Sequence, residues 1–152
     1  MQSQRGAAAI EFAIVAIPLI TLCFAGLECS LALQRFQALQ FSVAAAVRYL
    51  SLSQPGDSSA MLTAQCLAIT GTPNVSLNQC TDAPIVPGAK LFNAEVCDVA
   101  QCSHPQQMIL ADGTHLNLVS VSTRDIEMTD FPEWLDVLVF PNIQYSMVQP
   151  SA

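Results

Sequence analysis

The feature that most constrains the fold of this sequence is a long apolar stretch near its N-terminus. Residues 7–33 carry only two charged side chains, Glu11 and Glu28, and 16 consecutive uncharged residues lie between them. As an α-helix this stretch would be about 40 Å long, whereas the hydrocarbon core of a bilayer is about 30 Å thick. The sequence therefore predicts a single membrane-spanning helix over residues 7–33.

Glu11 stands out because it places a carboxylate inside this apolar helix. A charge at the centre of a bilayer costs about 2.5–3.5 kcal/mol, and less towards the interface, so such a residue is a functional candidate that needs a partner. Gly6 precedes Glu11 by five residues and follows the short leader MQSQR. Pro18 lies in the same helix and predicts a helix kink, either merely tolerated or used as a soft point, because proline removes one helical hydrogen bond.

Beyond residue 33 the helical pattern continues and becomes amphipathic. Apolar residues recur at spacings of three and four, which places them on one face of a helix; they are Phe36, Leu39, Val43, Val47 and Leu50. We expect this helix to end near residues 51–53, because Pro55-Gly56 follows. The expected segments are a membrane part at 7–33, an amphipathic stalk helix at 34–54 and a separate domain at 55–152.

The charge of the chain is divided unevenly between these segments. The whole chain has a net charge of −7 at pH 7, and residues 55–152 hold ten acidic residues against Lys90 and Arg124. Binding to nucleic acid or to anionic lipid requires clustered basic residues. The acidic domain therefore argues against nucleic acid and anionic lipid surfaces as its partners.

The six cysteines fall into two groups. Cys23 and Cys29 lie in the apolar helix, where they are most simply small apolar residues. The other four allow three pairings; of these we favour the two nearest-neighbour disulfides, Cys66–Cys80 and Cys97–Cys102. By closing a 15-residue loop, the first disulfide would stabilise the fold by about 3 kcal/mol. Because disulfides indicate an oxidising compartment, we expect residues 55–152 to be periplasmic or extracellular and the N-terminus to be cytoplasmic.

After the stalk helix the sequence predicts one short helix and several strands. The helix covers residues 58–69, with Ser58 or Ser59 as its N-cap, and a loop-rich stretch follows from 70 to 88. We expect strands at 90–97, 106–111, 115–124 and 138–148. The segment Ala111-Asp112-Gly113-Thr114 is typical of a hairpin, whereas Pro141 restricts the last strand to a sheet edge or a bulge. The predicted fold class is α+β: a long N-terminal transmembrane and stalk helix, then a small disulfide-bonded, β-rich domain.

The sequence contains no convincing catalytic, metal or cofactor site. The spacing of its candidate zinc ligands fits no common zinc pattern; these ligands are Cys97, Cys102, His104 and His115. The acidic segment 125–136 lacks the EF-hand pattern with its central glycine, so a solvated loop is favoured over a site for a cation or partner. No glycines frame a serine as they do in a nucleophile elbow. We therefore expect a protein that is not an enzyme and that uses no metal, cofactor or small-molecule substrate.

The order of features at the N-terminus resembles a class III, prepilin-type signal. A short basic leader is followed by a glycine, four small or apolar residues, Glu11-Phe12 and a long apolar run. The continuation resembles the TadE-like family, the pseudopilins of tight-adherence (type IVc) pilus systems; it reads EFAIVAIPLITLCFAGLE and then QALQFSVAAAVRYL. This resemblance extends from residue 5 to about residue 50.

The resemblance implies a minor pilin of the bacterial inner membrane that later reaches the pilus or cell surface. A prepilin peptidase would cut between Gly6 and Ala7, which makes residues 1–6 a leader peptide. Glu11 could then pair with the new ammonium group of Ala7 in a neighbouring subunit and neutralise a charge that hydrocarbon disfavours. The implied partners are the peptidase and other pilin or pseudopilin subunits, with a role in initiating or capping a pilus used in surface adhesion.

Two other classes of protein remain open from the sequence. An uncleaved single-span envelope protein would keep Met1 or Gln2 and would bind a ligand or partner through its ectodomain. A secreted protein released by ordinary signal cleavage would begin near residues 26–30, where the small residues match a cleavage site poorly. The position of the mature N-terminus separates these classes.

Overall fold

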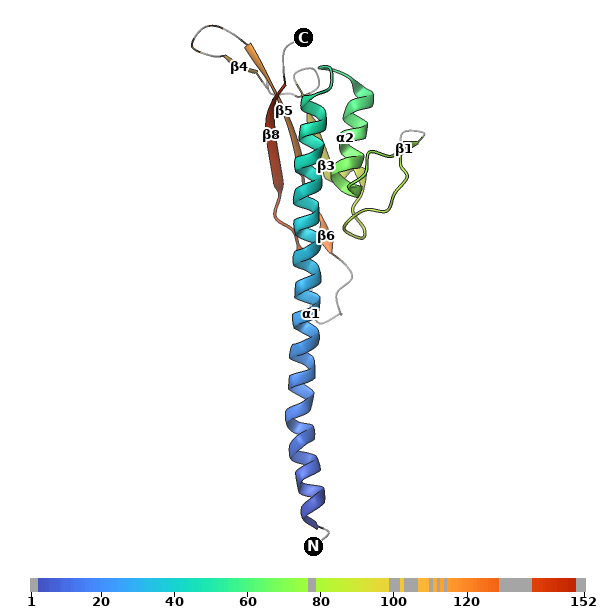
Figure 1. Ribbon diagram of the computed structural model, residues 1–152, viewed down its shortest axis with the longest axis vertical. Coiled ribbons are helices and arrows are strands. Elements are labelled where there is room, and N and C mark those ends of the chain that lie inside the picture. The colour runs from blue at the N-terminus through green and yellow to red at the C-terminus, as the bar shows by residue number, and fades with distance from the viewer. Residues whose placement is uncertain are drawn as a thin grey trace. The chain divides into compact units, whose positions relative to one another are not determined.

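The computed structural model describes residues 3–76, 79–98, 102, 107–109, 111, 113, 115–128 and 138–149, with the backbone alone at 3–8, 107–109, 115, 128 and 138. The chain divides into two compact units, Met1–Gln34 and Arg35–Ala152. Helix α1 (Ser3–Ser51) begins in the first unit and ends in the second (Figure 1).

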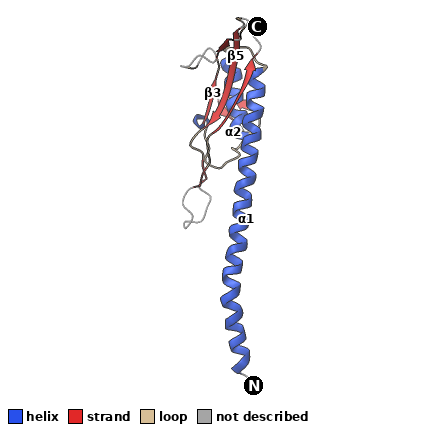
Figure 2. Cartoon of the chain, turned by 90° about the vertical axis from the view of Figure 1, so that its left-hand side faces the viewer, coloured by secondary structure: helices blue, strands red, loops and turns tan. Residues whose placement is uncertain are grey.

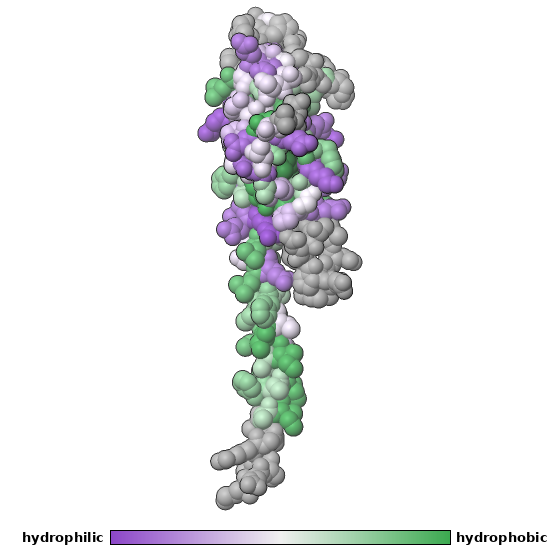
Figure 3. Space-filling view, turned by 90° about the vertical axis from the view of Figure 1, so that its right-hand side faces the viewer, coloured by the Kyte–Doolittle hydropathy of each residue, from purple (hydrophilic) through white to green (hydrophobic). Residues whose placement is uncertain are grey.

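In the first unit, α1 is apolar on all sides. Its large apolar side chains between Ile10 and Leu33 are each 51–75% exposed, and Figure 3 shows such residues, in green, on the visible face of this part of the helix. A helix that is apolar all round belongs in a membrane or in a protein interior. The segment Ala9–Ser51 is long and apolar enough to cross a membrane.

The described residues of the second unit add one further α-helix and eight strands. Helix α2 (Ser58–Thr70) is followed by the hairpin β1 (Val75–Ser76) and β2 (Gln79–Cys80), then by the 3₁₀ turn η1 (Leu91–Asn93). The remaining strands are β3 (Ala94–Cys97), β4 (Gln107–Ile109), β5 (His115–Thr123), β6 (Glu127–Met128), β7 (Leu138–Val139) and β8 (Ile143–Gln149).

Strand β5 is the centre of the main sheet, and all of its pairings are antiparallel. On one side, residues 120–123 of β5 pair with β3 and residues 115–117 pair with β4. On the other side, residues 117–123 pair with the whole of β8. Figure 2 shows β3 and β5 beside the two helices. The antiparallel pairing of β4 with β5 confirms the hairpin predicted at residues 111–114.

The core forms where the amphipathic half of α1 meets this sheet. Leu39, Val43, Val47 and Leu50 are at most 1% exposed, so four of the five residues on the predicted face are fully buried. The fifth, Phe36, is half-buried and its ring stacks on that of Phe140 at a centroid distance of 5.4 Å. The sequence pattern therefore identified the buried face of α1 correctly.

The last strand fastens the C-terminal end of α1. Gln149 in β8 is fully buried, and its Nε2 donates to the carbonyl oxygens of Leu50 at 3.3 Å and Ser53 at 2.7 Å. Carbonyl groups at a helix C-terminus lack partners within the helix, so this amide acts as their cap. Since Phe140 contacts Phe36 and Gln149 reaches Leu50, β8 runs in the same direction as this part of α1.

The predicted N-cap of α2 was wrong. Ser58 and Ser59 both lie inside the helix, and the cap is Asp57, whose Oδ1 accepts from the backbone N–H groups of Ser59 at 2.9 Å and Ala60 at 3.4 Å. Aspartate is as good an N-cap as serine and carries a negative charge that the helix dipole favours. The helix itself lies within one residue of the prediction, 58–69.

Two predicted strands are shorter than expected. The segment 90–97 starts as the turn η1 because the N–H of Lys90 donates to Oδ1 of Asn93 at 2.8 Å, which closes a turn in place of a strand. The segment 138–148 is interrupted at residues 140–142, where Pro141 lacks an N–H for ladder pairing. The loop-rich stretch 70–88 contains the small hairpin β1–β2. The predicted α+β class is confirmed.

Candidate functional site

The residues predicted for processing and assembly all lie on α1. Gly6 and Ala7 are in its first two turns, and Glu11 follows Ala7 by one further turn of helix. The side chains of Glu11 and Phe12 are exposed, Phe12 to 75%. Among the described residues no cation pairs with Glu11. The cleavage after Gly6 and the pairing of Glu11 stay predictions, since both require another molecule.

Helix α1 continues through Pro18 without interruption. The hydroxyl of Thr21 donates to the carbonyl oxygen of Pro18 at 2.9 Å, a bond typical of hydroxyl side chains within apolar helices. The functional use of a kink at Pro18 stays a prediction.

Both favoured disulfides are present in the second unit. Cys66, which is fully buried on α2, bonds to Cys80 and so ties α2 to the hairpin β1–β2. Cys97, the last residue of β3, bonds to Cys102. Cys23 and Cys29 are free and exposed on α1, in agreement with the two groups defined from the sequence.

The second unit has a hollow between α2 and β3, which we name the α2–β3 groove. One part has a volume of about 600 Å³ and a neighbouring part about 410 Å³, and both are lined by Gln65 and Val96. The first part is otherwise lined by Ser58, Ser59, Met61, Leu62, Thr63 and Val75, and the second by Phe92, Asn93, Ala94, Glu95, Arg124 and Asp125.

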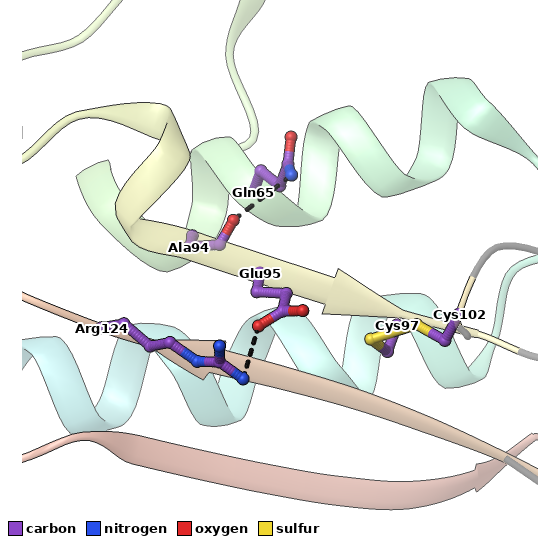
Figure 4. A network of polar contacts seen from close by, with 6 residues as sticks. All are labelled: Gln65, Ala94, Glu95, Cys97, Cys102 and Arg124. Carbon is purple, nitrogen blue, oxygen red and sulfur yellow. Dashed lines mark hydrogen bonds and ion pairs between the residues drawn. A yellow bond between two sulfur atoms is a disulfide. The ribbon is translucent and has the colours of Figure 1, made fainter. Parts of the chain in front are cut away.

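Polar contacts hold the walls of the α2–β3 groove in place. Nε2 of Gln65 on α2 donates to the carbonyl oxygen of Ala94 on β3 at 3.3 Å, and Arg124 forms an ion pair with Glu95 at 2.8 Å (Figure 4). Both charged side chains are about half exposed, so this pair orients them and contributes little stability. Figure 4 shows α2 running along β3 on the side away from β5.

A buried asparagine organises the far end of the α2–β3 groove. Nδ2 of Asn93 donates to the carbonyl oxygens of Arg124 at 3.0 Å and Asp125 at 3.1 Å. Asp125 has a φ of 51°, a left-handed conformation that aspartate adopts more readily than most residues. The Asp125 carboxylate is therefore carried on a fixed turn at the edge of the groove.

Sequence reasoning missed several polar residues that the fold brings together. Asp98 is 1% exposed and accepts from the backbone N–H of Gly56 at 2.7 Å, which ties the turn after α1 to the end of β3. Asp82 accepts from the hydroxyl of Thr72 and from Nδ2 of Asn74, and these two bonds lower the pKa of its carboxyl. No local pattern could reveal the first contact, because its two residues are 42 positions apart.

Several predicted candidates lie outside the described residues. These are His104 and the acidic residues 129–136, while only the backbone of His115 is described. Of the acidic segment 125–136, the structure describes residues 125–128. Within the described part of the chain, no group of three His, Cys, Asp or Glu side chains is placed to hold a metal ion.

Comparison with known proteins identifies one family. The family model described as TadE-like protein matches residues 6–48, which is the part of α1 that holds Gly6, Glu11 and the alanine-rich segment before Tyr49. The resemblance to the TadE-like family is thereby confirmed for this segment. No curated protein and no solved structure matches the chain.

Proposed function

We propose that this chain is a minor pilin, or pseudopilin, of a tight-adherence (type IVc) pilus. The observation that carries this proposal is the match of residues 6–48 to the TadE-like family, which suggests involvement in tight-adherence pilus systems. In this proposal residues 1–6 are a leader, 7–33 span the inner membrane, 34–54 form the stalk and 55–152 form a periplasmic domain. A prepilin peptidase cuts between Gly6 and Ala7.

The position of Glu11 gives this proposal a physical basis. A carboxylate in hydrocarbon needs a partner of opposite charge, and cleavage after Gly6 would create an ammonium group at Ala7. Glu11 is exposed on α1 and has no cationic partner among the described residues, so it is available to the ammonium group of a neighbouring subunit. The spacing between the glycine and the glutamate then follows from this pairing.

The surface of α1 also supports assembly through helix packing. The apolar residues from Ile10 to Leu33 suit a bilayer before assembly and the helices of neighbouring subunits after it. Phe41 and Leu52, which lie beyond the apolar span, are 77% and 81% exposed.

The proposed role requires no catalytic activity of this protein. The TadE-like family is not known for enzymatic activity, and we propose that this chain is a substrate of the peptidase and a partner of other pilin and pseudopilin subunits. Its function is then to initiate or cap a pilus used in surface adhesion. An uncleaved envelope protein with a binding domain is the alternative.

The mature N-terminus tests the proposal directly. Intact mass and terminal sequencing of protein extracted from membranes should give a chain that begins at Ala7. Removing the peptidase gene or changing Gly6→Leu should leave the leader attached, whereas Gly26→Leu, in the same helix with open space around it, should be cleaved normally. A wild-type chain that begins at Met1 or Gln2 would contradict the proposal and favour the uncleaved envelope protein.

A further inference from the structure

We propose that the outer edge of β8 pairs with β8 of a second copy of this chain, which is presented by an opposing surface. The two strands run antiparallel, and Ser146 of each copy lies at the centre of the pair. The pairing uses the second unit alone, so it does not depend on cleavage after Gly6. Only its setting, between two facing membranes or fibres, rests on the proposed function.

Strand β8 has an open outer edge. Among the described strands it pairs with β5 only, in one continuous antiparallel register that includes all of its residues. Figure 4 shows β8, in faint red, beyond β5 on the side away from β3. Residues 144–148 are all exposed. This edge is therefore accessible to another strand.

The hydrogen bonds of the sheet show which main-chain groups of β8 face outwards. The N–H of Arg124 donates to the carbonyl oxygen of Asn93 at 2.8 Å, so the even-numbered residues of β5 point to β3. The odd-numbered residues of β5 then point to β8, where Val121 pairs with Tyr145 and the register continues in steps of two. The even-numbered residues of β8 therefore point to the open edge; they are Gln144, Ser146 and Val148.

Strand β8 lacks the features by which exposed strand edges avoid pairing. Such edges carry charged side chains, a proline or a bulge. The sequence of β8, IQYSMVQ, has no charge and no proline, and its register with β5 contains no bulge. The residues that follow Asp136, as far as residue 152, are also uncharged. No charge on this strand would therefore repel the same strand of a second copy.

The strand is self-complementary about Ser146. In an antiparallel pair centred there, the outward main-chain groups of Ser146 meet those of Ser146 in the second copy, and those of Gln144 meet those of Val148. Tyr145 and Met147 then lie opposite each other at a non-hydrogen-bonded position, where side chains approach most closely. They are 40% and 39% exposed in the single chain, and a methionine sulfur beside an aromatic ring is a favourable contact. Every outward group of the strand thus finds a partner in a second copy.

The direction of β8 determines how the two copies can meet. It runs in the same direction as the part of α1 in the second unit, because Phe140 contacts Phe36 and Gln149 reaches Leu50. In an antiparallel pair these two parts of α1 therefore point in opposite directions. Copies that stand in one membrane with their N-termini on the same side do not meet in this way. The pairing instead joins copies that face each other from two membranes or two fibres.

The net charge of the chain predicts how salt affects this contact. Two copies with a net charge of −7 repel each other at a distance, and salt screens this repulsion. Pairing through an uncharged strand should therefore strengthen as salt rises, whereas docking of opposite charges would weaken. One pair of strands buries less than the roughly 1,200 Å² of a typical stable interface. We therefore expect a weak contact that becomes strong when many copies act together.

Cysteine cross-linking of the full chain in detergent tests the centre and direction of the pair. Cys23→Ser and Cys29→Ser first remove the free cysteines of α1. In this background Ser146→Cys should form a disulfide-linked dimer on oxidation, because the two Cα atoms would lie about 5.5 Å apart, within disulfide range. Gln144→Cys and Val148→Cys should form little dimer alone and should cross-link when they are mixed.

Vesicle clustering tests the meeting of opposing surfaces. The full chain is reconstituted into phosphatidylcholine vesicles, and clustering is followed by dynamic light scattering against empty vesicles. We expect clustering that increases with salt. Ser146→Lys should abolish it, because two lysines would lie opposite each other, whereas Ser146→Thr, a good strand former, should preserve it. Ser76→Lys, the same change at the exposed residue of β1, should have no effect.

Several results would overturn the proposal. They are vesicles that do not cluster at any salt concentration, clustering that survives Ser146→Lys, and equal loss of clustering with Ser76→Lys. Gln144→Cys that cross-links with itself as readily as Ser146→Cys would indicate a parallel pair and would overturn it as well. None of these results depends on where the mature chain begins, so the failure of this pairing and the failure of the proposed function are distinguishable.

Discussion

The two disulfides should differ measurably in how much they stabilise the domain. Cys66–Cys80 and Cys97–Cys102 have sequence separations of 14 and 5, so they close loops of about 15 and about 6 residues. In the chain-entropy account a cross-link restricts the unfolded chain more as its loop grows, which gives about 3 kcal/mol for the first bond and about 2.2 kcal/mol for the second. Breaking the first bond should therefore cost about 0.8 kcal/mol more than breaking the second.

Single substitutions can remove each bond with little change in packing. Cys80→Ala leaves the fully buried Cys66 in place as a small apolar thiol, and Cys102→Ala leaves Cys97. Urea unfolding of the full chain in detergent, followed by fluorescence of its single tryptophan, gives the midpoints. With a denaturant slope of about 1.5 kcal/mol/M, the midpoint should fall by about 2 M for Cys80→Ala and by about 1.5 M for Cys102→Ala.

The order of the two shifts is the result that matters. A reductant added to the wild type should lower the midpoint below that of either variant, because it breaks both bonds. Equal shifts, or a larger shift for Cys102→Ala, would refute the reasoning from loop length and indicate that native-state packing dominates.

Three further results are expected. Glu11→Gln should reduce the amount of the protein recovered in sheared pili, as measured by immunoblot, while Glu28→Gln should reduce it less; equal recovery for Glu11→Gln and wild type would rule out charge pairing. The bonds that Asp57 accepts, first from the Ser59 hydroxyl and then from backbone N–H groups, hold the pKa of its carboxyl below the ordinary value of an aspartate. The stabilisation from these bonds is therefore complete above the ordinary pKa and is lost as pH falls through the lowered pKa. Asp57→Asn, followed by unfolding between pH 6 and pH 2, should remove this part of the pH dependence, and an unchanged profile would contradict it. Val43→Ala should lower the free energy of unfolding by about 2–3 kcal/mol, because Val43 on α1 is fully buried, whereas Ala45→Gly on the exposed face should cost about 1 kcal/mol.

Local patterns in the sequence were sufficient for the helices and for the hairpin between β4 and β5. The spacing of Leu39, Val43 and Val47 identified the buried face of α1 because helical periodicity needs no knowledge of the partner. The resemblance to the TadE-like family rested on the same segment, and the family match ends at residue 48. Prediction worked best where the information lies within a few turns of one helix.

Local sequence patterns could not predict contacts between residues that are far apart in the chain. Asn93, whose Oδ1 closes the turn η1 in place of an expected strand, also donates from Nδ2 to the carbonyl oxygens of Arg124 and Asp125, about 30 positions later. The α2–β3 groove likewise depends on how α2 lies along β3, which a linear pattern does not encode. The cap of α2 was missed for a different reason, since three adjacent residues, Asp57, Ser58 and Ser59, are all good N-caps.

The cap that Gln149 forms over the end of α1 has a consequence for how this chain is made and handled. Gln149 lies 99 and 96 positions after the two residues it binds, so the sheet cannot close over the buried face of α1 until synthesis has passed Gln149. Until then Leu39, Val43 and Val47 remain uncovered and available to chaperones or to misassociation. For the same reason an affinity tag fused after residue 152 would sit three residues from the group that completes the fold. A tag inserted at the exposed turn around Gly113 would leave that closure untouched.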